Sequence, residues 1–273
     1  VALKPSLHGS LAAWMAGVPA VVNAFAGMGF VFISNGLFAR LARPLLVGAF
    51  RFLLNRDSTR TIVQNDDDAQ LFIDRVGVDP RRITVIRGSG VNLEQFKPLV
   101  IPRTPDVPVA VCVSRMLWDK GIDELVAAAR LLKSRGVVLK IRLVGPDDDN
   151  PAAISQDQLD VWAAEGIVDI AGPSDDIPDV YADADIAVLP SYREGLPKSL
   201  QEAAAGLPLV ATDVPGCREI CRDEDTGLLV PLKSVEPLAD ALECLAKNPD
   251  LRAKFGAAAR TAAEKDFSEA RVI

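Results

Sequence analysis

The second half of the chain constrains the fold most, because short apolar segments alternate there with amphipathic ones. Residues 109–113 and 186–189, for example, are apolar on both faces. Strands that are buried on both faces and joined through helices form parallel sheets with helices on both sides. The sequence therefore predicts an α/β fold with a doubly wound parallel sheet, with strands at 109–113, 138–144, 168–171, 185–189, 208–211 and 228–230 and helices at 122–135, 155–164, 176–183, 199–205, 235–247 and 249–264.

The first half alternates helices and strands less regularly. Ser6 is expected to cap a helix that Gly17 ends. Asp66, Asp67 and Asp68 are expected to cap another, since the helix dipole stabilises acidic side chains at a helix start. A metal site at these three aspartates is the less favoured alternative. The predicted elements are helices 6–17 and 69–76, strands 18–23, 61–64 and 83–86, and a turn at 88–92.

The stretch 36–56 is amphipathic and basic, with arginines at positions 40, 43, 51 and 56. Pro44 predicts a break into two helices, since proline lacks the N–H group that an interior helical position donates. The apolar face can pack in the domain core or rest on an anionic membrane surface, and packing in the core is the favoured interpretation. No apolar run in the chain is long enough to span a bilayer.

Composition argues against several classes of function. The net charge of −7 argues against nucleic acid as a partner, because a phosphate backbone requires a basic surface. The four cysteines lack the paired Cys-x-x-Cys spacing and His8 is the sole histidine, so no zinc site is expected. Reduced thiols are the favoured state of the cysteines.

Three loops follow strands of the predicted sheet at its carboxyl edge, where such folds bind ligands. The loop 114–121 carries Arg115 and Lys120, and the loop 190–198 carries Glu194 and Lys198; the loop 145–150 is acidic. Two cations together with backbone N–H groups suit a diphosphate, and carboxylates such as Glu194 and Glu202 suit sugar hydroxyls. Together these residues favour a ligand site.

Simpler interpretations stay open for the same residues. Ser199 and Glu202 fit a capping box, in which Glu202 only satisfies a backbone N–H group. Arg115 and Lys120 fit surface charges that flank the start of the helix 122–135.

Several segments together resemble the retaining glycosyltransferases of family 4. Residues 114–121, Ser-Arg-Met-Leu-Trp-Asp-Lys-Gly, are similar to the G-R-L-x-x-x-K-G segment of that family, with Ser114 where glycine is common. Glu194 and Glu202 are spaced as in its E-x7-E signature, within Leu-Pro-Ser-x-x-Glu-Gly-Leu-Pro. Nearly the whole chain is covered, because matches also occur at 88–98, 207–216 and 227–230. Residues 3–5 and 17–32 resemble bacterial transferases that build surface polysaccharides or lipid-linked glycans.

This resemblance implies a GT-B fold, with two Rossmann-like domains of parallel sheets and an incomplete first domain. The implied parts are the remnant of an acceptor-side domain (1–98), a proline-rich linker (99–108), a nucleotide-sugar-binding domain (109–264) and the start of a C-terminal crossover helix (265–273). We expect the chain to be a fragment at both ends, because it begins at Val1 and stops as a helical pattern starts.

Residue by residue, the resemblance assigns Arg115 and Lys120 to the donor diphosphate, as catalytic groups that offset the charge of the leaving group. Glu194, also assigned as catalytic, would contact hydroxyls of the donor sugar, and Glu202 those of the ribose. The other expected substrate-binding residues are Gly195, Leu196, Pro197, Lys198 and Ser199 around sugar and phosphate, and Gly172 and Ile177 near the base. His8 is expected to be structural or acceptor-side.

The implied activity is transfer, with retention, of a hexose or N-acetylhexosamine from a nucleotide-diphosphate sugar, UDP rather than GDP, to a lipid-linked or polysaccharide acceptor. The expected partners are this donor and a glycan or polyprenyl-linked acceptor, with no metal or other cofactor and no nucleic acid. We expect a cytoplasmic location, with peripheral contact at the inner face of the cell membrane through 36–56. The alternatives are a UDP-sugar epimerase of the same fold and a non-catalytic nucleotide-sugar-binding remnant, since the fragment itself can be inactive.

Overall fold

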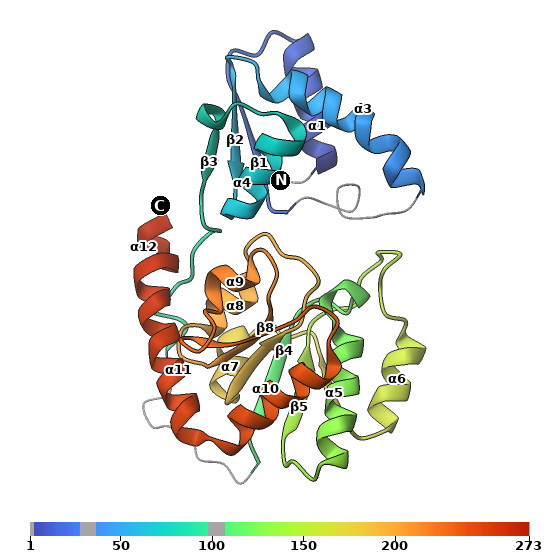
Figure 1. Ribbon diagram of the computed structural model, residues 1–273, viewed down its shortest axis with the longest axis vertical. Coiled ribbons are helices and arrows are strands. Elements are labelled where there is room, and N and C mark those ends of the chain that lie inside the picture. Colours follow the sequence, from blue (N-terminus) through green and yellow to red (C-terminus); the bar gives the residue numbers. More distant parts are fainter. Residues whose placement is uncertain (1–2, 28–36, 98–106, 273) are drawn as a thin grey trace. The chain divides into compact units, whose positions relative to one another are not determined.

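The computed structural model describes residues 3–27, 37–97 and 107–272, and the chain divides into two compact units (Figure 1). The first unit consists of residues 1–88 together with 194–196, and the second of residues 89–193 and 197–273. Residues 89–97, which the sequence assigned to the first domain, belong to the second unit by this division. Most of the expected linker 99–108 lies outside the described residues.

The first unit is built on a small parallel sheet. Among the described residues, β1 (Val21–Phe25), β2 (Thr59–Val63) and β3 (Ile83–Val85) pair in the order β1-β2-β3. The helical segments are α1 (Leu3–Met15), α3 (Leu37–Leu54), α4 (Asp66–Leu71), the π-helical turn η1 (Phe72–Val76) and the 3-10 turn η2 (Pro80–Arg82). Helices and sheet share one core, which consists of Phe25, Phe50, Leu54, Val63, Phe72, Val76 and Val78.

The expected break at Pro44 is wrong, because α3 runs through this residue as one helix. Pro44 is exposed, so water can bind the carbonyl group that the missing N–H leaves unpaired. Phe50 and Leu54 are fully buried and hold the same helix in the core. Core packing therefore outweighs the cost of the proline.

Both expected helix caps of the first unit are also wrong. α1 begins at Leu3, and Ser6 is buried within it rather than capping it. Asn65 caps α4, because its side-chain oxygen accepts a hydrogen bond from the N–H of Asp68 at 2.7 Å. The three aspartates form the first helical turn instead, where the helix dipole stabilises them.

The second unit has a larger sheet, and all of its strand pairs are parallel. Its order within the described residues is β6-β5-β4-β7-β8-β9. The strands are β4 (Val109–Val113), β5 (Lys140–Val144), β6 (Val168–Gly172), β7 (Ile186–Leu189), β8 (Leu209–Thr212) and β9 (Gly227–Val230). The predicted α/β class with a doubly wound parallel sheet is confirmed, and β4 has the predicted bounds.

Helices follow the strands of the second unit in alternation (Figure 1). α5 packs against α10, whereas α11 contacts β8 and β9. The short helix α9 was not expected from the sequence, which indicated only a turn at Gly216. The helical segments are η3 (Trp118–Lys120), α5 (Ile122–Ser134), α6 (Gln156–Ala164), α7 (Ile177–Ala182), α8 (Lys198–Ala203), α9 (Cys217–Ile220), α10 (Val235–Lys247), α11 (Pro249–Ala262), the π-helical turn η4 (Ala263–Phe267) and α12 (Glu269–Val272).

Candidate functional site

The carboxyl ends of β4 and β7 mark the candidate site. β4 pairs with β5 on one side and with β7 on the other, so the chain builds one half of the sheet before it crosses over to build the other. Open α/β sheets bind ligands at this topological switch point, beyond the carboxyl ends of the strands. The loops that leave these two strands, 114–121 and 190–197, carry charged residues predicted from the sequence.

Two glycines let the neighbouring loops approach more closely than a side chain would permit. Gly121 has a φ of 70°, and a Cβ atom placed on it would lie 2.1 Å from the carbonyl oxygen of Pro190. A Cβ atom on Gly145, which follows β5, would lie 1.8 Å from the carbonyl oxygen of Ser114. The loops after β4, β5 and β7 are therefore in backbone contact, and the position of each constrains the others.

Tyr192 joins the loop after β7 to the loop after β4. Its backbone N–H donates to the carbonyl of Asp119 at 2.8 Å, and its hydroxyl donates to Oε1 of Glu124 at 2.7 Å. The ammonium of Lys233 lies 4.4 Å from the centre of the ring, within the range of a cation–π interaction. Burial, together with the Glu124 carboxylate, raises the pKa of the Tyr192 hydroxyl above its ordinary value.

Arg115 and Lys120 lie near the two ends of the loop after β4. The Arg115 side chain is 54% exposed, and its Nη1 atom lies 2.6 Å from Oδ2 of Asp148 in the loop after β5. An exposed ion pair contributes about 0–1 kcal/mol, so a more strongly charged anion can replace the carboxylate. Lys120 ends η3 directly before α5 and is half-buried. Both cations lie at the carboxyl edge, and their binding of a diphosphate stays a prediction.

α8 begins one residue earlier than the sequence predicted. Pro197, with a φ of −65°, is the N-cap residue, and no side chain makes a capping hydrogen bond. Ser199 therefore lies inside the first turn, and the capping box of Ser199 and Glu202 is wrong. The fixed φ of proline already suits entry into a helix. The carbonyl of Ser199 accepts a hydrogen bond from the buried hydroxyl of Tyr181 at 2.7 Å, which ties α8 to α7.

Glu202 is a largely buried carboxylate on α8. Its side chain is 15% exposed, and its Oε1 atom lies 3.9 Å from Nζ of Lys198. Burial raises the pKa of Glu202, and the Lys198 ammonium counteracts this effect only in part. Lys198 also donates a hydrogen bond to the carbonyl of Gly90, in the turn 88–92. A shielded and weakly paired carboxylate is a suitable acceptor for ligand hydroxyls.

The other predicted residues of the loop after β7 precede α8. Glu194 is half-buried, whereas Gly195, Leu196 and Pro197 are buried. The contact of Glu194 with sugar hydroxyls and the contacts of the backbone N–H groups of this loop with sugar and phosphate stay predictions.

Gly172 and Ile177 lie at the far side of the same edge. Gly172 ends β6 with a φ of 72°, and the space that a Cβ atom would enter is open. Ile177 is the first residue of α7, which Asp176 caps. Two strand spacings, about 10 Å, separate β6 from β4 in the sheet. This is the scale of a nucleotide whose phosphates lie near β4 and whose base lies near β6, although the role of both residues stays a prediction.

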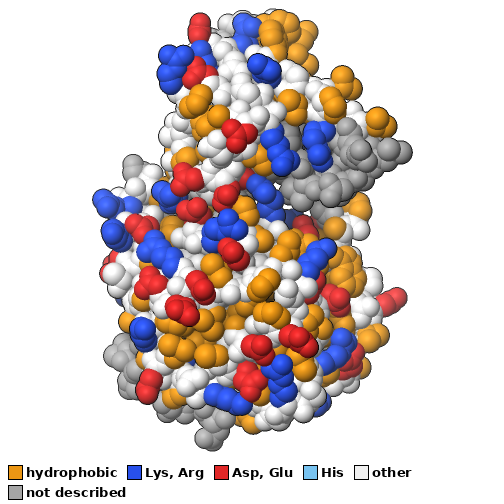
Figure 2. All heavy atoms as spheres, viewed as in Figure 1, with side chains coloured by type: hydrophobic (Ala, Val, Ile, Leu, Met, Phe, Trp, Pro, Cys, Tyr) orange, Lys and Arg blue, Asp and Glu red, His pale blue; other side chains and the backbone are white. Residues whose placement is uncertain are grey.

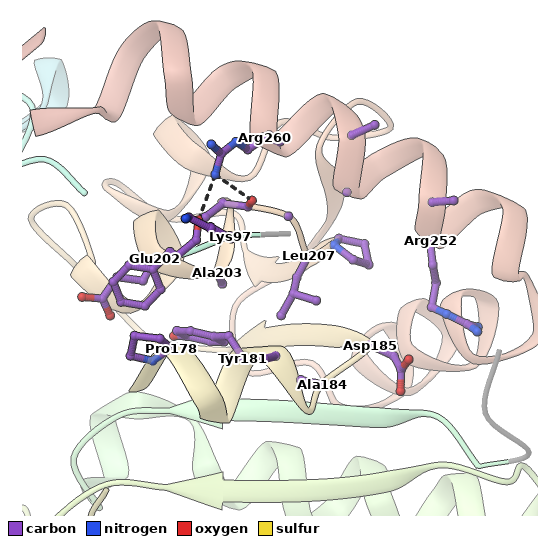
Figure 3. Close-up of a pocket in the computed structure, with 18 of the residues that line it drawn as sticks. Lys97, Pro178, Tyr181, Ala184, Asp185, Glu202, Ala203, Leu207, Arg252 and Arg260 are labelled. Atoms are coloured by element: carbon purple, nitrogen blue, oxygen red, sulfur yellow. Dashed lines mark hydrogen bonds between the residues drawn. The ribbon is translucent and has the colours of Figure 1, made fainter. Parts of the chain in front are cut away.

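A pocket of about 400 Å³ lies against α11 and shares Glu202 with the candidate site (Figure 3). Its lining is mostly apolar and includes Tyr181 and Leu207, and Arg260 borders it. Asp185, which directly precedes β7, also lines it, so the pocket reaches the amino end of this strand. Of the predicted site residues in the described part of the chain, Glu202 alone lines this pocket.

In residues 3–27, 37–97 and 107–272, no group of three or more His, Cys, Asp or Glu side chains is arranged to hold a metal ion. Within the same ranges, no helix is both long and apolar enough to cross a membrane.

Sequence reasoning missed the residues that hold the loops of the site together. Tyr181 and Tyr192 are the two tyrosines of the chain, and each joins a loop or helix of the site to its neighbour. Asp148, the partner of Arg115, was visible only as part of an acidic loop. The rarity of tyrosine was the one signal in the composition that could have drawn attention to these positions.

Comparison with known proteins places this geometry in context. Residues 107–248 match the family model described as "Glycosyl transferases group 1". The chain is 30% identical over 261 residues to N,N'-diacetylbacillosaminyl-diphospho-undecaprenol alpha-1,3-N-acetylgalactosaminyltransferase of Campylobacter jejuni, covering 91% of this chain and 67% of the relative. It is 27% identical to UDP-Gal:alpha-D-GlcNAc-diphosphoundecaprenol alpha-1,3-galactosyltransferase of Escherichia coli, covering 88% of this chain and 63% of the relative. The chain spans about half the length of other curated relatives, such as the putative glycosyltransferase EpsD of Bacillus subtilis, with 52% covered.

Solved structures share the fold at low sequence identity. Sucrose-phosphate synthase from Thermosynechococcus elongatus superposes with a TM-score of 0.80 at 22% identity, over 97% of this chain and 69% of that one. Anabaena HepE, crystallised with UDP and glucose, superposes with a TM-score of 0.79 at 19% identity, over 99% of this chain and 73% of that one. At such identities the likeness concerns the fold alone.

Proposed function

The chain belongs to the glycosyl transferases of group 1 and has their GT-B fold, and we propose that the protein transfers a hexose or N-acetylhexosamine from a UDP-sugar to a lipid-linked or polysaccharide acceptor, with retention at the anomeric carbon. The observation that carries the proposal is the arrangement at the switch point. Arg115 and Lys120 follow β4 there, and the Lys198–Glu202 pair follows β7. Cations beside a shielded carboxylate suit a ligand that joins a diphosphate to sugar hydroxyls.

In the proposed reaction, Arg115 exchanges Asp148 for phosphate oxygens of the donor, and Lys120 binds the same diphosphate. As the bond between the anomeric carbon and the diphosphate oxygen breaks, negative charge grows on the leaving group. The two cations stabilise this charge, because the loops already hold them in position. The acceptor hydroxyl attacks from the same face and gives its proton to the leaving diphosphate. No metal or other cofactor takes part in this scheme.

The choice of donor and acceptor is supported by the names of the relatives. Those of Campylobacter jejuni and Escherichia coli are both named for undecaprenol-diphosphate-linked acceptors, and the second is named for UDP-galactose. A UDP-sugar epimerase of the same fold would use the same donor. Transfer of labelled sugar to an acceptor supports the transferase, whereas an epimerised free nucleotide sugar supports the epimerase.

Titration calorimetry with UDP tests the donor site. We expect the 273-residue chain to bind UDP and Lys120→Ala to weaken binding about tenfold or more, the effect of losing a hydrogen bond between charged groups. Lys133→Ala is a matched control, because this exposed lysine lies at the other end of α5. The proposal is wrong if the wild-type chain binds no nucleoside diphosphate.

A further inference from the structure

Three residues of the loop after β7 are part of the first unit. Glu194, Gly195 and Leu196 follow a strand of the second sheet along the chain, yet they belong to the first compact unit. We call these three residues the loop tip. The carbonyl of Gly195 accepts a buried hydrogen bond of 2.6 Å from Nδ2 of Asn65, which lies 130 positions away in the sequence. The position of Glu194, directly before Gly195, therefore depends on the first unit.

Two strand ends of the first unit receive the loop tip. Ala26 directly follows β1, and Gln64 and Asn65 directly follow β2. The two strands pair in parallel, so their carboxyl ends lie side by side (Figure 1). A Cβ atom placed on Gly195 would lie 2.5 Å from Oε1 of Gln64 and 2.6 Å from the carbonyl oxygen of Ala26. Position 195 therefore has no room for a side chain, and the backbone of the loop tip packs directly on these strand ends.

The neighbours of the Asn65 amide fix its orientation. Its Oδ1 atom accepts a hydrogen bond from the N–H of Asp68 at 2.7 Å, the bond that caps α4. Its Nδ2 atom donates to the Gly195 carbonyl and, at 3.2 Å, to Oδ2 of Asp68. A flipped amide would direct its oxygen at a carbonyl and a carboxylate and its NH₂ group at an N–H group. One side chain therefore both caps a helix and holds the loop tip.

The contact is shielded from water. Figure 2 shows Asp, Glu, Lys and Arg side chains spread over the surface of the molecule, where charged groups normally lie. Asn65 and Asp68, by contrast, are both 0% exposed. Water does not readily replace a hydrogen bond that is lost at such a depth, so its loss costs more than the loss of an exposed one.

We infer that Asn65 is a positioning residue for the donor sugar. It holds the Gly195 carbonyl and thereby sets where the adjacent Glu194 carboxylate meets sugar hydroxyls. The inference rests on the proposed function and on the predicted contact of Glu194 with the donor sugar. Arg115 and Lys120, which are proposed to bind the diphosphate, have no part in it. Binding of UDP alone should therefore be independent of Asn65, whereas binding of a UDP-sugar should depend on it.

Two substitutions of Asn65 remove the donated hydrogen bond and keep the helix cap. In Asn65→Ser the hydroxyl oxygen can still accept the N–H of Asp68, because serine and asparagine cap helices about equally well. The shorter side chain lacks the amide group that reaches Gly195. Asn65→Asp keeps the shape and the cap and replaces the donor by an acceptor. The two variants are expected to act in the same direction, so either one serves if the other fails to fold.

Asn55→Ser is the matched control. Asn55 also lies in the first unit, accepts a hydrogen bond from a backbone N–H group and donates to two backbone carbonyls. None of these three partners belongs to the loop tip. The control therefore removes a similar set of hydrogen bonds from the same unit and leaves the contact with Gly195 intact.

Hydrogen exchange of the 273-residue chain without ligand tests the hold on the loop. Peptides that span 190–200 should exchange about tenfold faster in Asn65→Ser than in the wild type, because a buried bond that opposes local opening is lost. Asn55→Ser should leave the exchange of these peptides unchanged. Equal exchange in the wild type and in Asn65→Ser overturns the inference, whatever the chain does with nucleotides.

Titration calorimetry with UDP and with UDP-glucose, UDP-galactose and their N-acetylamino counterparts tests the effect on the sugar. In both Asn65 variants the Kd of the tightest-binding UDP-sugar should rise about tenfold, the effect of misplacing hydrogen bonds to a charged group, and the Kd of UDP should not change. Asn55→Ser should alter neither Kd. An unaltered UDP-sugar Kd, or a wild-type chain that binds UDP and none of these UDP-sugars, overturns the inference alone. A wild-type chain that binds no nucleoside diphosphate refutes the proposed function itself.

A double-mutant cycle shows whether Asn65 acts through Glu194. Glu194→Gln should itself raise the Kd of the UDP-sugar, and adding Asn65→Ser to that variant should raise it by less than about twofold. Additive effects of the two substitutions would mean that Asn65 influences the sugar by another route, and would contradict its role as a positioning residue.

Discussion

Replacing Glu202 by glutamine should separate what this residue does for the ligand from what it does for the fold. Its carboxylate is 15% exposed, and its nearest cationic atom, Nζ of Lys198, is 3.9 Å away. Burial outweighs this attraction and raises the pKa of Glu202. The ionised side chain is therefore held in an environment that disfavours its charge, and a ligand that donates hydrogen bonds would relieve that cost.

Two opposite effects follow from Glu202→Gln. The amide keeps the shape of the side chain and carries no charge, so the folded protein should be stabilised by about 1 kcal/mol at neutral pH. In the donor site the neutral oxygen replaces a charged acceptor for the ribose hydroxyls. Loss of one charge-assisted hydrogen bond is worth about 1.5 kcal/mol, so UDP affinity should fall about tenfold. A stabilised protein with weakened ligand binding is the expected signature.

The pH dependence identifies the source of the stabilisation. A carboxyl group with a raised pKa binds more protons in the folded than in the unfolded state, so stability falls as the pH rises between the two pKa values. The unfolded value is 4.5. The destabilising effect of Glu202 is therefore complete above its folded pKa and absent below about pH 4.5. The advantage of glutamine should be present at pH 7 and should disappear on acidification.

Urea unfolding at pH 7 and at pH 4.5, together with calorimetry with UDP, measures both effects. Glu165→Gln is a control of opposite sign, because hydrogen bonds from Arg130 lower the pKa of Glu165. That variant should lose stability at pH 7 and keep its UDP affinity. Unchanged UDP affinity in Glu202→Gln would refute the ligand role, and a loss of stability at pH 7 would refute the account of its burial.

Two further predictions concern the contacts between loops. Tyr192→Phe removes the 2.7 Å hydrogen bond to Glu124, whose Oε2 atom is already buried without a partner. The variant should lose about 1–2 kcal/mol of stability in urea unfolding and should bind UDP more weakly. Unchanged stability and UDP affinity would contradict the role of Tyr192 in holding the loop. Gly121→Ala should destabilise the chain and weaken UDP binding, because the new Cβ atom would lie 2.1 Å from the carbonyl oxygen of Pro190. Gly136→Ala is the control, since Gly136 has the same φ of 70° but faces open space. This control should lose only about 1–2 kcal/mol of stability, the cost of a left-handed backbone, and should keep its UDP affinity.

The sheet of the second unit was predictable because its strands β4, β7 and β8 are buried on both faces. Residues 109–113 and 186–189 have no polar side chain to place, so few alternatives compete with a buried parallel strand. The positions of Arg115 and Lys120 at the carboxyl edge then followed from connectivity alone. The loop contacts did not follow, because they depend on backbone approach at Gly121 and Gly145, and a glycine in the sequence does not show what it approaches.

Local signals failed where tertiary structure outweighed them. Pro44 is a strong helix breaker in isolation, yet α3 is held by Phe50 and Leu54, six and ten residues further on, in the core of the unit. Ser199 has the residue type of a helix cap, yet Pro197 precedes it and enters the helix first. In both cases the sequence pattern described a preference of a few kilocalories at most, and packing or chain geometry decided the outcome.

The partners of the predicted site residues change how donor binding has to be understood. Arg115 already contacts Asp148, and Lys198 contacts both Gly90 and Glu202. Binding a diphosphate is then an exchange of partners, so the affinity reports the difference between two sets of contacts rather than the sum of one. Lys198 in particular joins α8 to the turn 88–92 through Gly90, which like Lys198 belongs to the second unit. A donor that attracts Lys198 therefore has to compete with the Gly90 carbonyl for the same ammonium.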